Sequence, residues 1–382
     1  MQPTVSKIPL VQLASGDFVF LQVYKFRGAT SGKKAYLQSN LHGAEISGNA
    51  VIHHLIADLI QLDETQLDGE IWLVPVCNPL GVNQRAHHFS SGRYNSYDGK
   101  DWNRIFWDYE KAEVDIAEFA RSQQNLSPSE IQQNYRQKIL ESFQNLAETT
   151  KYPSQIPYWE YYRTILQSLC LDADYVIDLH SSTNRGLDYL YCFHSREESA
   201  KAFLLDCGIL MNDYDGDAFD EAFLKPWLAL EKYLRELGKP VQFDIESWTL
   251  ELGSGMKMNP ESIEKGIRGI KNYLADKKLL KIDGFPLNET ANHPLKLTLK
   301  SHTHRYYAPA GGMIQNRVEL GSLVKSGETL YEILSFNKTE ELPQILAVKA
   351  EVTGIIFDIS TNHTVNQCDY VLSVMEQVST QR

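Results

Sequence analysis

The chain has 382 residues, 43% hydrophobic and 23% charged, which is the composition of a globular protein large enough for more than one domain. Its formal net charge is −12 and it has no block rich in lysine and arginine, which argues against nucleic acid as a partner. The longest apolar runs, such as residues 71–76, are far too short to span a bilayer, which argues against a membrane protein.

Five cysteines are scattered along the chain without a CxxC pair. This pattern predicts reduced thiols in the cytoplasm rather than disulfides or a cysteine-based zinc site. The first residues contain no basic stretch followed by an apolar core, so no signal peptide is expected. An acidic protein can still bind an anionic substrate if the positive charge is local, so any arginine in the pocket becomes a residue of interest.

The first two thirds of the chain alternate predicted strands with predicted helices. Residues 47–62 carry apolar positions at helical spacing. Short apolar runs predict strands at 18–26, 34–39, 70–76, 173–179 and 243–250. This alternation predicts an α/β domain with a mainly parallel, mixed sheet flanked by helices.

A long polar stretch at 106–171 interrupts the alternation. Its helical periodicity, which includes 127–147, predicts inserted helices on the rim of the domain. The polar surface of these helices is a candidate subunit surface in a homo-oligomer. Two more helices are predicted at 226–237 and 260–277, the second with proline in its first turn.

Towards the C-terminus the sequence changes to short β-rich runs separated by glycine, asparagine and serine. The first of these runs is 295–299, and no long helical pattern follows it. We therefore expect an α/β domain at 1–285 and a separate, small all-β domain at 286–382.

The expected β domain contains an internal repeat. Residues 311–334 and 353–376 each carry, at or next to their first residue, a glycine that precedes an apolar strand, followed by a turn and a second strand. The repeat predicts a small sandwich or barrel of two hairpin units, similar to lipoyl and biotinyl domains. No exposed carrier lysine stands out, so we expect this domain to shape the entrance of a site on the first domain.

Two polar segments follow predicted strands. NLHGAE places His42 and Glu45 three residues apart, and the strand in YVIDLHSS ends in His180. Because open α/β sheets bind ligands at the carboxyl ends of their strands, we expect these side chains at one edge. Imidazole and carboxylate are good zinc ligands, and a catalytic zinc keeps three protein ligands and a position for water. We expect Gly43 to allow a sharp turn between the ligands and Asp178 to orient one of them.

Five blocks in this order, NLHGAE, NPLGVNQR, DWNR, DLHSS and TLELGSG, resemble the zinc carboxypeptidase-like superfamily. Within it, the chain is most similar to the succinylglutamate desuccinylase/aspartoacylase family. The resemblance covers roughly residues 35–285, and a small C-terminal β domain is also typical of that family. It implies a zinc carboxypeptidase-like fold and one Zn²⁺ per chain, held by His42, Glu45 and His180.

The resemblance also implies roles for residues around the metal. Glu251 in TLELG matches the catalytic glutamate, and Arg93 matches the arginine that polarises the scissile carbonyl. Asn103 and Arg104 in DWNR match the pair that binds a substrate carboxylate. An oxyanion donor of this kind typically contributes about 3–4 kcal/mol in the transition state, and an arginine can hold a carboxylate through two hydrogen bonds. Arg85 lies near Arg93, and the sequence leaves open which of the two reaches the oxyanion.

We therefore expect a cytoplasmic, zinc-dependent hydrolase that cleaves the amide bond of an N-acyl amino acid or a similar small carboxylated substrate. Two alternatives stay open: a zinc carboxypeptidase acting on short peptides, and a catalytically silent metal- or ligand-binding protein. Arg185 and Lys257 are candidates for recognising the acyl group, which the sequence does not identify. The His87-His88 pair is a candidate for lining the pocket, whereas His304 is not expected to bind metal.

Overall fold

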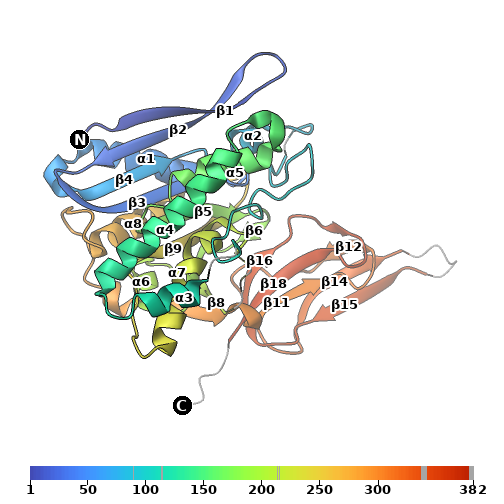
Figure 1. The fold of residues 1–382 in the computed structure, drawn as a ribbon. Coiled ribbons are helices and arrows are strands. Elements are labelled where there is room, and N and C mark those ends of the chain that lie inside the picture. The colour runs from blue at the N-terminus through green and yellow to red at the C-terminus, as the bar shows by residue number, and fades with distance from the viewer. Residues whose placement is uncertain (89, 113–114, 213, 215, 337–341, 378–382) are drawn as a thin grey trace.

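In the computed structural model, which describes all residues except 89, 113–114, 213, 215, 337–341 and 378–382, the first part of the chain is built on one large sheet (Figure 1). Nine strands of the described residues form it, in the order β1 (Thr4–Gln12), β2 (Phe18–Arg27), β4 (Asp68–Val74), β3 (Thr30–Ser39), β5 (Tyr175–Ser182), β9 (Glu246–Ser254), β7 (Tyr189–Phe193), β8 (Cys207–Met211) and β10 (Lys296–Leu299). Strands β4, β3, β5 and β9 are parallel, as are β7, β8 and β10. Antiparallel pairs join β1 to β2, β2 to β4 and β7 to β9. The predicted mainly parallel, mixed sheet is confirmed.

Helices cover both faces of this sheet. α1 (Ser47–Gln61) and α8 (Pro260–Asp276) pack on one face, and α7 (Phe219–Glu236) packs on the other. Neighbouring residues of β3 show the two environments, because Tyr36 joins the core with α7 and Leu37 joins the core with α1 and α8. Burial on both faces explains why the central strands appear in the sequence as continuous apolar runs. Among the described helices, none combines the length and apolar character needed to cross a membrane.

The polar stretch at 106–171 forms helices, as predicted. Their bounds are α3 (Ile116–Ser122), α4 (Pro128–Thr149) and α5 (Tyr158–Ser168). The buried residues of α4 recur every four positions, and the ring of Tyr135 lies 5.1 Å from that of Trp227 on α7. These helices therefore share a hydrophobic core with the sheet and lie across its face (Figure 1). Our expectation of helices on the rim is wrong, because their apolar stripes are long enough to join that core.

Helix α7 begins at Phe219, whereas we predicted a start at Pro226, which instead lies inside the helix. A proline in a helix interior costs about 3 kcal/mol or more because it removes a hydrogen bond and clashes with the preceding turn. Phe219 and Phe223 precede it and are buried. Burying such a side chain contributes about 1.5–3 kcal/mol, so the packing of this first part outweighs the cost of the proline.

The C-terminal part folds into two further sheets around a core of its own. One sheet has the order β11 (Thr303–Tyr307), β18 (Tyr370–Glu376), β16 (Gly354–Ile359) and β13 (Leu323–Val324). The other has the order β15 (Gln344–Lys349), β14 (Thr329–Ser335), β12 (Gly312–Gln315) and β17 (Thr364–Val365). The two repeated segments each supply a strand, a two-residue strand and a longer strand. Each segment's two-residue strand joins the sheet of the other segment: β13 of the first segment pairs with β16, and β17 of the second pairs with β12.

Two strands connect the parts of the chain. Residues 295–299, which we expected in the β domain, form β10, which pairs in parallel with β8 and extends the large sheet. This pairing covers an edge of β8 that would otherwise expose its backbone hydrogen-bonding groups. In the other direction, β6 (Arg185–Gly186), which follows β5 closely, pairs with β16. The C-terminal sheets therefore pack directly beside the end of β5.

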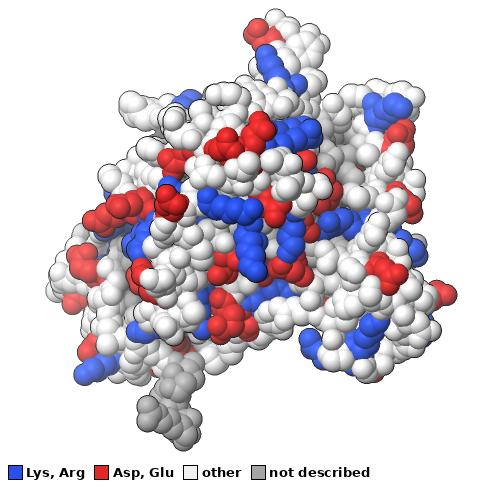
Figure 2. Space-filling model, turned by 90° about the vertical axis from the view of Figure 1, so that its left-hand side faces the viewer, with Lys and Arg blue, Asp and Glu red and all other residues white. Residues whose placement is uncertain are grey.

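Acidic and basic side chains are interspersed over the face of the molecule shown in Figure 2. This mixture on the face shown matches a sequence without a block rich in lysine and arginine.

Candidate metal centre

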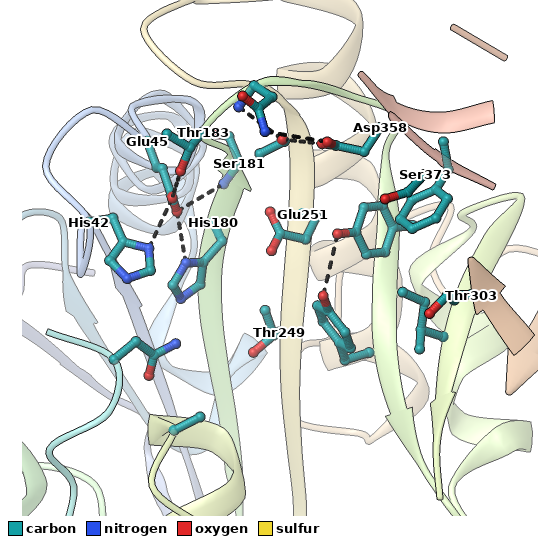
Figure 3. A pocket seen from close by; sticks show the side chains of 18 of the residues that line it. His42, Glu45, His180, Ser181, Thr183, Thr249, Glu251, Thr303, Asp358 and Ser373 are labelled. Carbon is teal, nitrogen blue, oxygen red and sulfur yellow. Dashed lines mark hydrogen bonds and ion pairs between the residues drawn. The ribbon is translucent and has the colours of Figure 1, made fainter. Parts of the chain in front are cut away.

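Three buried side chains converge at the carboxyl edge of the large sheet (Figure 3). His42 and Glu45 lie on the loop between β3 and α1, and His180 lies near the end of β5. Nδ1 of His42 is 2.9 Å from Oε1 of Glu45, and Nδ1 of His180 is 2.8 Å from Oε2 of Glu45. One ligand atom from each residue lies within 4.8 Å of the other two. The three ligands expected from the sequence are thus brought together in an arrangement that can hold one metal ion.

A carboxylate holds the other nitrogen of each imidazole. Nε2 of His180 is 2.8 Å from Oδ2 of Asp178, and Nε2 of His42 is 3.1 Å from Oδ1 of Asp101. Such carboxylates fix the ring orientation of a metal-binding histidine. Because they contact Nε2, they leave Nδ1 of each ring for a metal ion. The sequence indicated Asp178 as a partner of this kind. It did not indicate Asp101, although Asp101 begins the DWNR block.

The charges in this group favour a cation. Three carboxylates, from Glu45, Asp101 and Asp178, surround the two imidazoles. Burial by itself would raise the pKa of Glu45, but the two histidines lower it well below its usual range. Burial opposes protonation of His180, yet Asp178 and Glu45 raise its pKa. Arg93 supplies one positive charge beside Asp101 and Glu45. Two imidazole nitrogens with one carboxylate oxygen are a donor set that suits zinc.

The loop that carries His42 and Glu45 is held by two backbone constraints. Asn40 is in the left-handed region (φ 65°), and its Nδ2 donates a 2.9 Å hydrogen bond to the carbonyl oxygen of Glu45. A Cβ atom on Gly43 would lie 2.1 Å from the carbonyl oxygen of Gly81 in α2 (Pro79–Asn83). Gly43 is thus required for the close approach of two backbones, and the left-handed residue of this loop is Asn40, before the two ligands.

Glu251 on β9 faces the same cavity. Strands β5 and β9 are parallel, and their register pairs Glu251 with His180. Figure 3 shows Glu251 between His180 and the C-terminal strands. Its Oε2 is inaccessible to solvent and has no hydrogen-bond partner among the described residues. Desolvation, followed by the charge of Glu45, raises the pKa of Glu251 to about 7. A carboxylate with these properties is suited to accept a proton from water.

Of the two arginines considered for the oxyanion, Arg93 lies beside the metal group. Its Nη1 is 3.3 Å from Nδ1 of His42, and its Nε is 3.0 Å from Oδ2 of Asp101. Arg85 is exposed, does not line the cavity, and donates from its Nη1 to two backbone carbonyls at the end of α2. The geometry therefore favours Arg93.

Asn103 and Arg104 both line the cavity. Oδ1 of Asn103 accepts a 2.8 Å hydrogen bond from the backbone N–H of Phe219, the first residue of α7. It thereby satisfies one of the free amides at that helix terminus and leaves the side-chain NH₂ for other contacts. The guanidinium of Arg104 donates to the backbone carbonyl of Asn103, and it forms no ion pair within the described part of the chain.

The cavity has a volume of about 420 Å³ and is lined by both parts of the chain. The large sheet contributes Tyr189 and Tyr191, and the C-terminal sheets contribute Arg305, Phe357 and Tyr370. None of these five residues was indicated by the sequence. Each reaches the cavity through its place in a strand, and no local motif marks it.

Four residues that the sequence suggested for this pocket lie outside it. Arg185 and Lys257, considered for the acyl group, do not line the cavity. Lys257 is exposed on the loop after β9, and Arg185 is in β6, which pairs with β16. His87 and His88 are also exposed, with ring centroids 3.9 Å apart, and they do not line the cavity.

Asp358 on β16 connects the C-terminal sheets to the segment that follows His180. Its carboxylate accepts hydrogen bonds from the hydroxyl groups of Ser182 and Tyr370. In the same segment, Oγ1 of Thr183 lies 3.3 Å from Oε1 of Glu45. A side chain of the C-terminal part therefore supports the segment that contacts a candidate metal ligand.

Replacing Asp358 by alanine is expected to destabilise the protein by about 1–3 kcal/mol, because two partly buried hydroxyl groups lose their acceptor. The measurement is thermal or urea unfolding of the parent and the variant. Tyr370→Phe is the matched control, since it removes one of these hydrogen bonds and keeps the carboxylate, and it should destabilise less. An Asp358→Ala variant as stable as the parent would contradict the assigned link.

Comparison with known proteins decides the family. Residues 31–144 match the model of the succinylglutamate desuccinylase/aspartoacylase catalytic domain. The chain also superimposes on a solved structure from Shewanella frigidimarina NCIMB 400, described as a succinylglutamate desuccinylase/aspartoacylase, with a TM-score of 0.87, 26% identity and 98% of each chain covered. Residues 31–144 therefore carry the catalytic domain of the succinylglutamate desuccinylase/aspartoacylase family. The resemblance based on the five sequence blocks is thus confirmed.

Further solved structures share the fold of this chain. A family protein from Shewanella amazonensis SB2B has a TM-score of 0.83 and 26% identity, with 97% of this chain and 98% of that chain covered. The product-bound ectoine utilization protein EutE (DoeB) from Ruegeria pomeroyi has a TM-score of 0.66 and 16% identity over 99% and 96% of the two chains. At that identity the likeness shows the fold alone. A search of curated proteins gave no match.

Proposed function

We propose that this protein is a zinc-dependent hydrolase that cleaves the amide bond of an N-acyl amino acid or a similar small carboxylated molecule. The observation that carries the proposal is the convergence of two imidazole nitrogens and a carboxylate on one position, with the unpartnered oxygen of Glu251 facing the same cavity. The match of residues 31–144 to the succinylglutamate desuccinylase/aspartoacylase catalytic domain supports it. The five cysteines are unpaired, which supports a location in the cytoplasm.

Each group of residues in the site has its own role in the reaction. A zinc ion held by the three ligands would lower the pKa of a bound water towards neutrality and polarise the scissile carbonyl. Glu251 takes a proton from the attacking water and passes it to the nitrogen of the leaving amine. Arg93, whose Nη1 lies beside His42, donates hydrogen bonds to the carbonyl oxygen as negative charge develops on it.

Two residues of the DWNR block orient the substrate. Arg104 lines the cavity and has no ion-pair partner within the described residues, so its guanidinium is available for a substrate carboxylate. The side-chain NH₂ of Asn103 can donate to the same carboxylate, since its carbonyl oxygen is already bonded to α7. Holding the carboxylate in this way places the amide bond near the metal and Glu251.

The shape of the cavity supports a small acylated molecule over a longer peptide. Residues of β11, β16 and β18 form one of its walls, and its volume of about 420 Å³ is that of a small-molecule pocket. A carboxypeptidase acting on short peptides is the alternative with the same catalytic group. A silent metal-binding protein has no chemical need for Glu251.

The test is the release of free amine from a panel of N-acyl amino acids and dipeptides by the purified protein. We expect deacylation that disappears after chelation and returns when zinc is added. Turnover of dipeptides without turnover of N-acyl amino acids would favour the carboxypeptidase. No turnover of either class by zinc-loaded protein would contradict both and leave the silent binding protein.

A further inference from the structure

Residues 100–107 (the 100–107 segment) carry part of the candidate site but lie outside the helices and strands of the described chain. Asp101 in this segment contacts His42 and Arg93, and Asn103 accepts a hydrogen bond from the start of α7. Because buried peptide groups need hydrogen-bond partners, a segment without a helix or strand pattern is held by the side chains around it. Helix α5 supplies several of those side chains.

Two polar side chains of α5 bind the backbone of the 100–107 segment. Gln167 is 2% exposed, and its Oε1 accepts a 2.9 Å hydrogen bond from the backbone N–H of Trp107. Its Nε2 donates a 2.9 Å hydrogen bond to the carbonyl oxygen of the same residue. One turn earlier on the helix, Nη1 of Arg163 donates a 3.1 Å hydrogen bond to the carbonyl oxygen of Ile105. Helix α5 thus supplies the hydrogen bonds that a neighbouring strand would supply in a sheet.

Aromatic rings of α5 pack against Trp102, the residue after Asp101. The Trp102 side chain is buried, and its ring centroid lies 5.2 Å from that of Tyr162 and 6.0 Å from that of Tyr158. Both pairs meet edge to face, an arrangement that is favourable beyond the burial of the rings. The hydroxyl group of Tyr162 also donates a 3.1 Å hydrogen bond to the carbonyl oxygen of Cys77. This bond fixes the ring of Tyr162, and the position of Trp102 is fixed with it.

A shift of Trp102 would reach two groups beside the metal position. Its backbone N–H donates a 3.1 Å hydrogen bond to the carbonyl oxygen of Arg93. The preceding Asp101 contacts Arg93 with one carboxylate oxygen and His42 with the other. Neither Trp102 nor Gln167 lines the cavity, so their effect on the site passes through these neighbours. A misplacement of about 1 Å around the reacting atoms can cost a factor of about 100 in rate.

We propose that α5 positions the metal centre: Trp102 and Gln167 hold the 100–107 segment so that Asp101 orients the candidate ligand His42 and the guanidinium of Arg93. This inference rests on the proposed function. Trp102 and Gln167 are positioning residues, since they act through Asp101. The carboxylate partner of a metal-binding histidine typically accounts for a factor of about 10 to 100 in metal affinity. A change that displaces Asp101 without removing it should cost part of that factor, about three- to tenfold.

The test measures the zinc dissociation constant by competition with a chelating dye, together with kcat and KM on the best N-acyl amino acid. Gln167→Leu keeps the size of the side chain but removes both hydrogen bonds to Trp107, and Trp102→Leu removes both ring contacts. Each should raise the zinc dissociation constant about three- to tenfold and lower kcat by a similar factor, with a smaller effect on KM. Trp102→Phe keeps an aromatic ring against Tyr162 and should recover most of the zinc affinity.

Ile131→Ala is the matched control, because Ile131 is buried on α4 in the same hydrophobic core. It should lower the unfolding temperature, as the other variants do, but keep the zinc dissociation constant and kcat of the parent. A second control uses the Asp101→Ala background. There Gln167→Leu should cause no further loss of zinc affinity, since both changes act through the same carboxylate.

Folded Gln167→Leu and Trp102→Leu variants with the zinc affinity and kcat of the parent would overturn the inference and leave the proposed function intact. An equal loss in Ile131→Ala would do the same, as would a loss from Gln167→Leu that adds in full to that of Asp101→Ala. A parent that binds no zinc would overturn the proposed function and this inference with it.

Discussion

Replacing Glu251 by glutamine is expected to lower kcat by about 100- to 10,000-fold while the zinc content stays at the level of the parent. Glutamine keeps the size of the side chain, but it cannot accept the proton of the attacking water, and general base catalysis of this kind contributes that factor. Glu251 is not one of the three converging ligands, and its Oε2 has no partner to lose among the described residues. The measurements are kcat on the best N-acyl amino acid, metal content by mass spectrometry and the unfolding temperature.

Asp220 provides a matched control. Its carboxylate lines the same cavity, but it accepts a 2.8 Å hydrogen bond from Oγ1 of Thr249. Asp220→Asn should therefore reduce kcat far less than Glu251→Gln. Equal losses in the two variants would mean that the cavity is sensitive to any change of charge and that Glu251 has no special role.

The pH profile provides a second test of the same residue. Desolvation and the charge of Glu45 raise the pKa of Glu251 to about 7, and the positive charge of a bound metal ion lowers it from there. Because only the carboxylate form accepts a proton, kcat/KM should fall about tenfold per pH unit below this pKa. The acid limb should therefore lie at or below pH 7. It should be absent from the residual activity of Glu251→Gln, and its persistence there would assign it to another group.

The convergence of the three candidate metal ligands could be predicted because each lies in a short block at the end of a strand. His42 follows β3, and His180 lies near the end of β5. Because β3 and β5 are neighbouring parallel strands, both side chains reach the same edge of the sheet. The central strands were predictable for a related reason, since burial on both faces produces continuous apolar runs. In both cases the signal is local in the sequence. The topology of a parallel sheet then buries the central strands and places the residues that follow them at one edge.

The other half of the cavity could not be predicted, because it depends on pairings between distant segments. Arg305 faces the site only because β11 pairs with β18 in a particular register and because β6 joins β16. A shift of one residue in β11 would place Tyr306 in the cavity and Arg305 in the core. The assignment of residues 295–299 failed for the same reason, since a short β-rich run does not show which sheet it will join.

Replacing both histidine ligands by alanine is expected to abolish metal binding and activity together. The parent should contain about one equivalent of zinc, as a site with three protein ligands requires, and the His42→Ala/His180→Ala variant should contain little. His304 is the matched control, because its Nε2 lies 2.9 Å from a carboxylate oxygen of Glu376 outside the converging group. His304→Ala should keep the zinc content of the parent.

The double variant leaves the buried carboxylate of Glu45 without its two nearest partners, so its fold has to be checked by circular dichroism. A measurement on the parent avoids this difficulty. Zinc at 100 times its dissociation constant should stabilise the chelated parent by about 2.7 kcal/mol, which raises its unfolding temperature, because the ion binds only the folded chain. The same addition should leave the double variant unchanged. An equal rise in both proteins would place the metal elsewhere and leave His42, Glu45 and His180 without their proposed role.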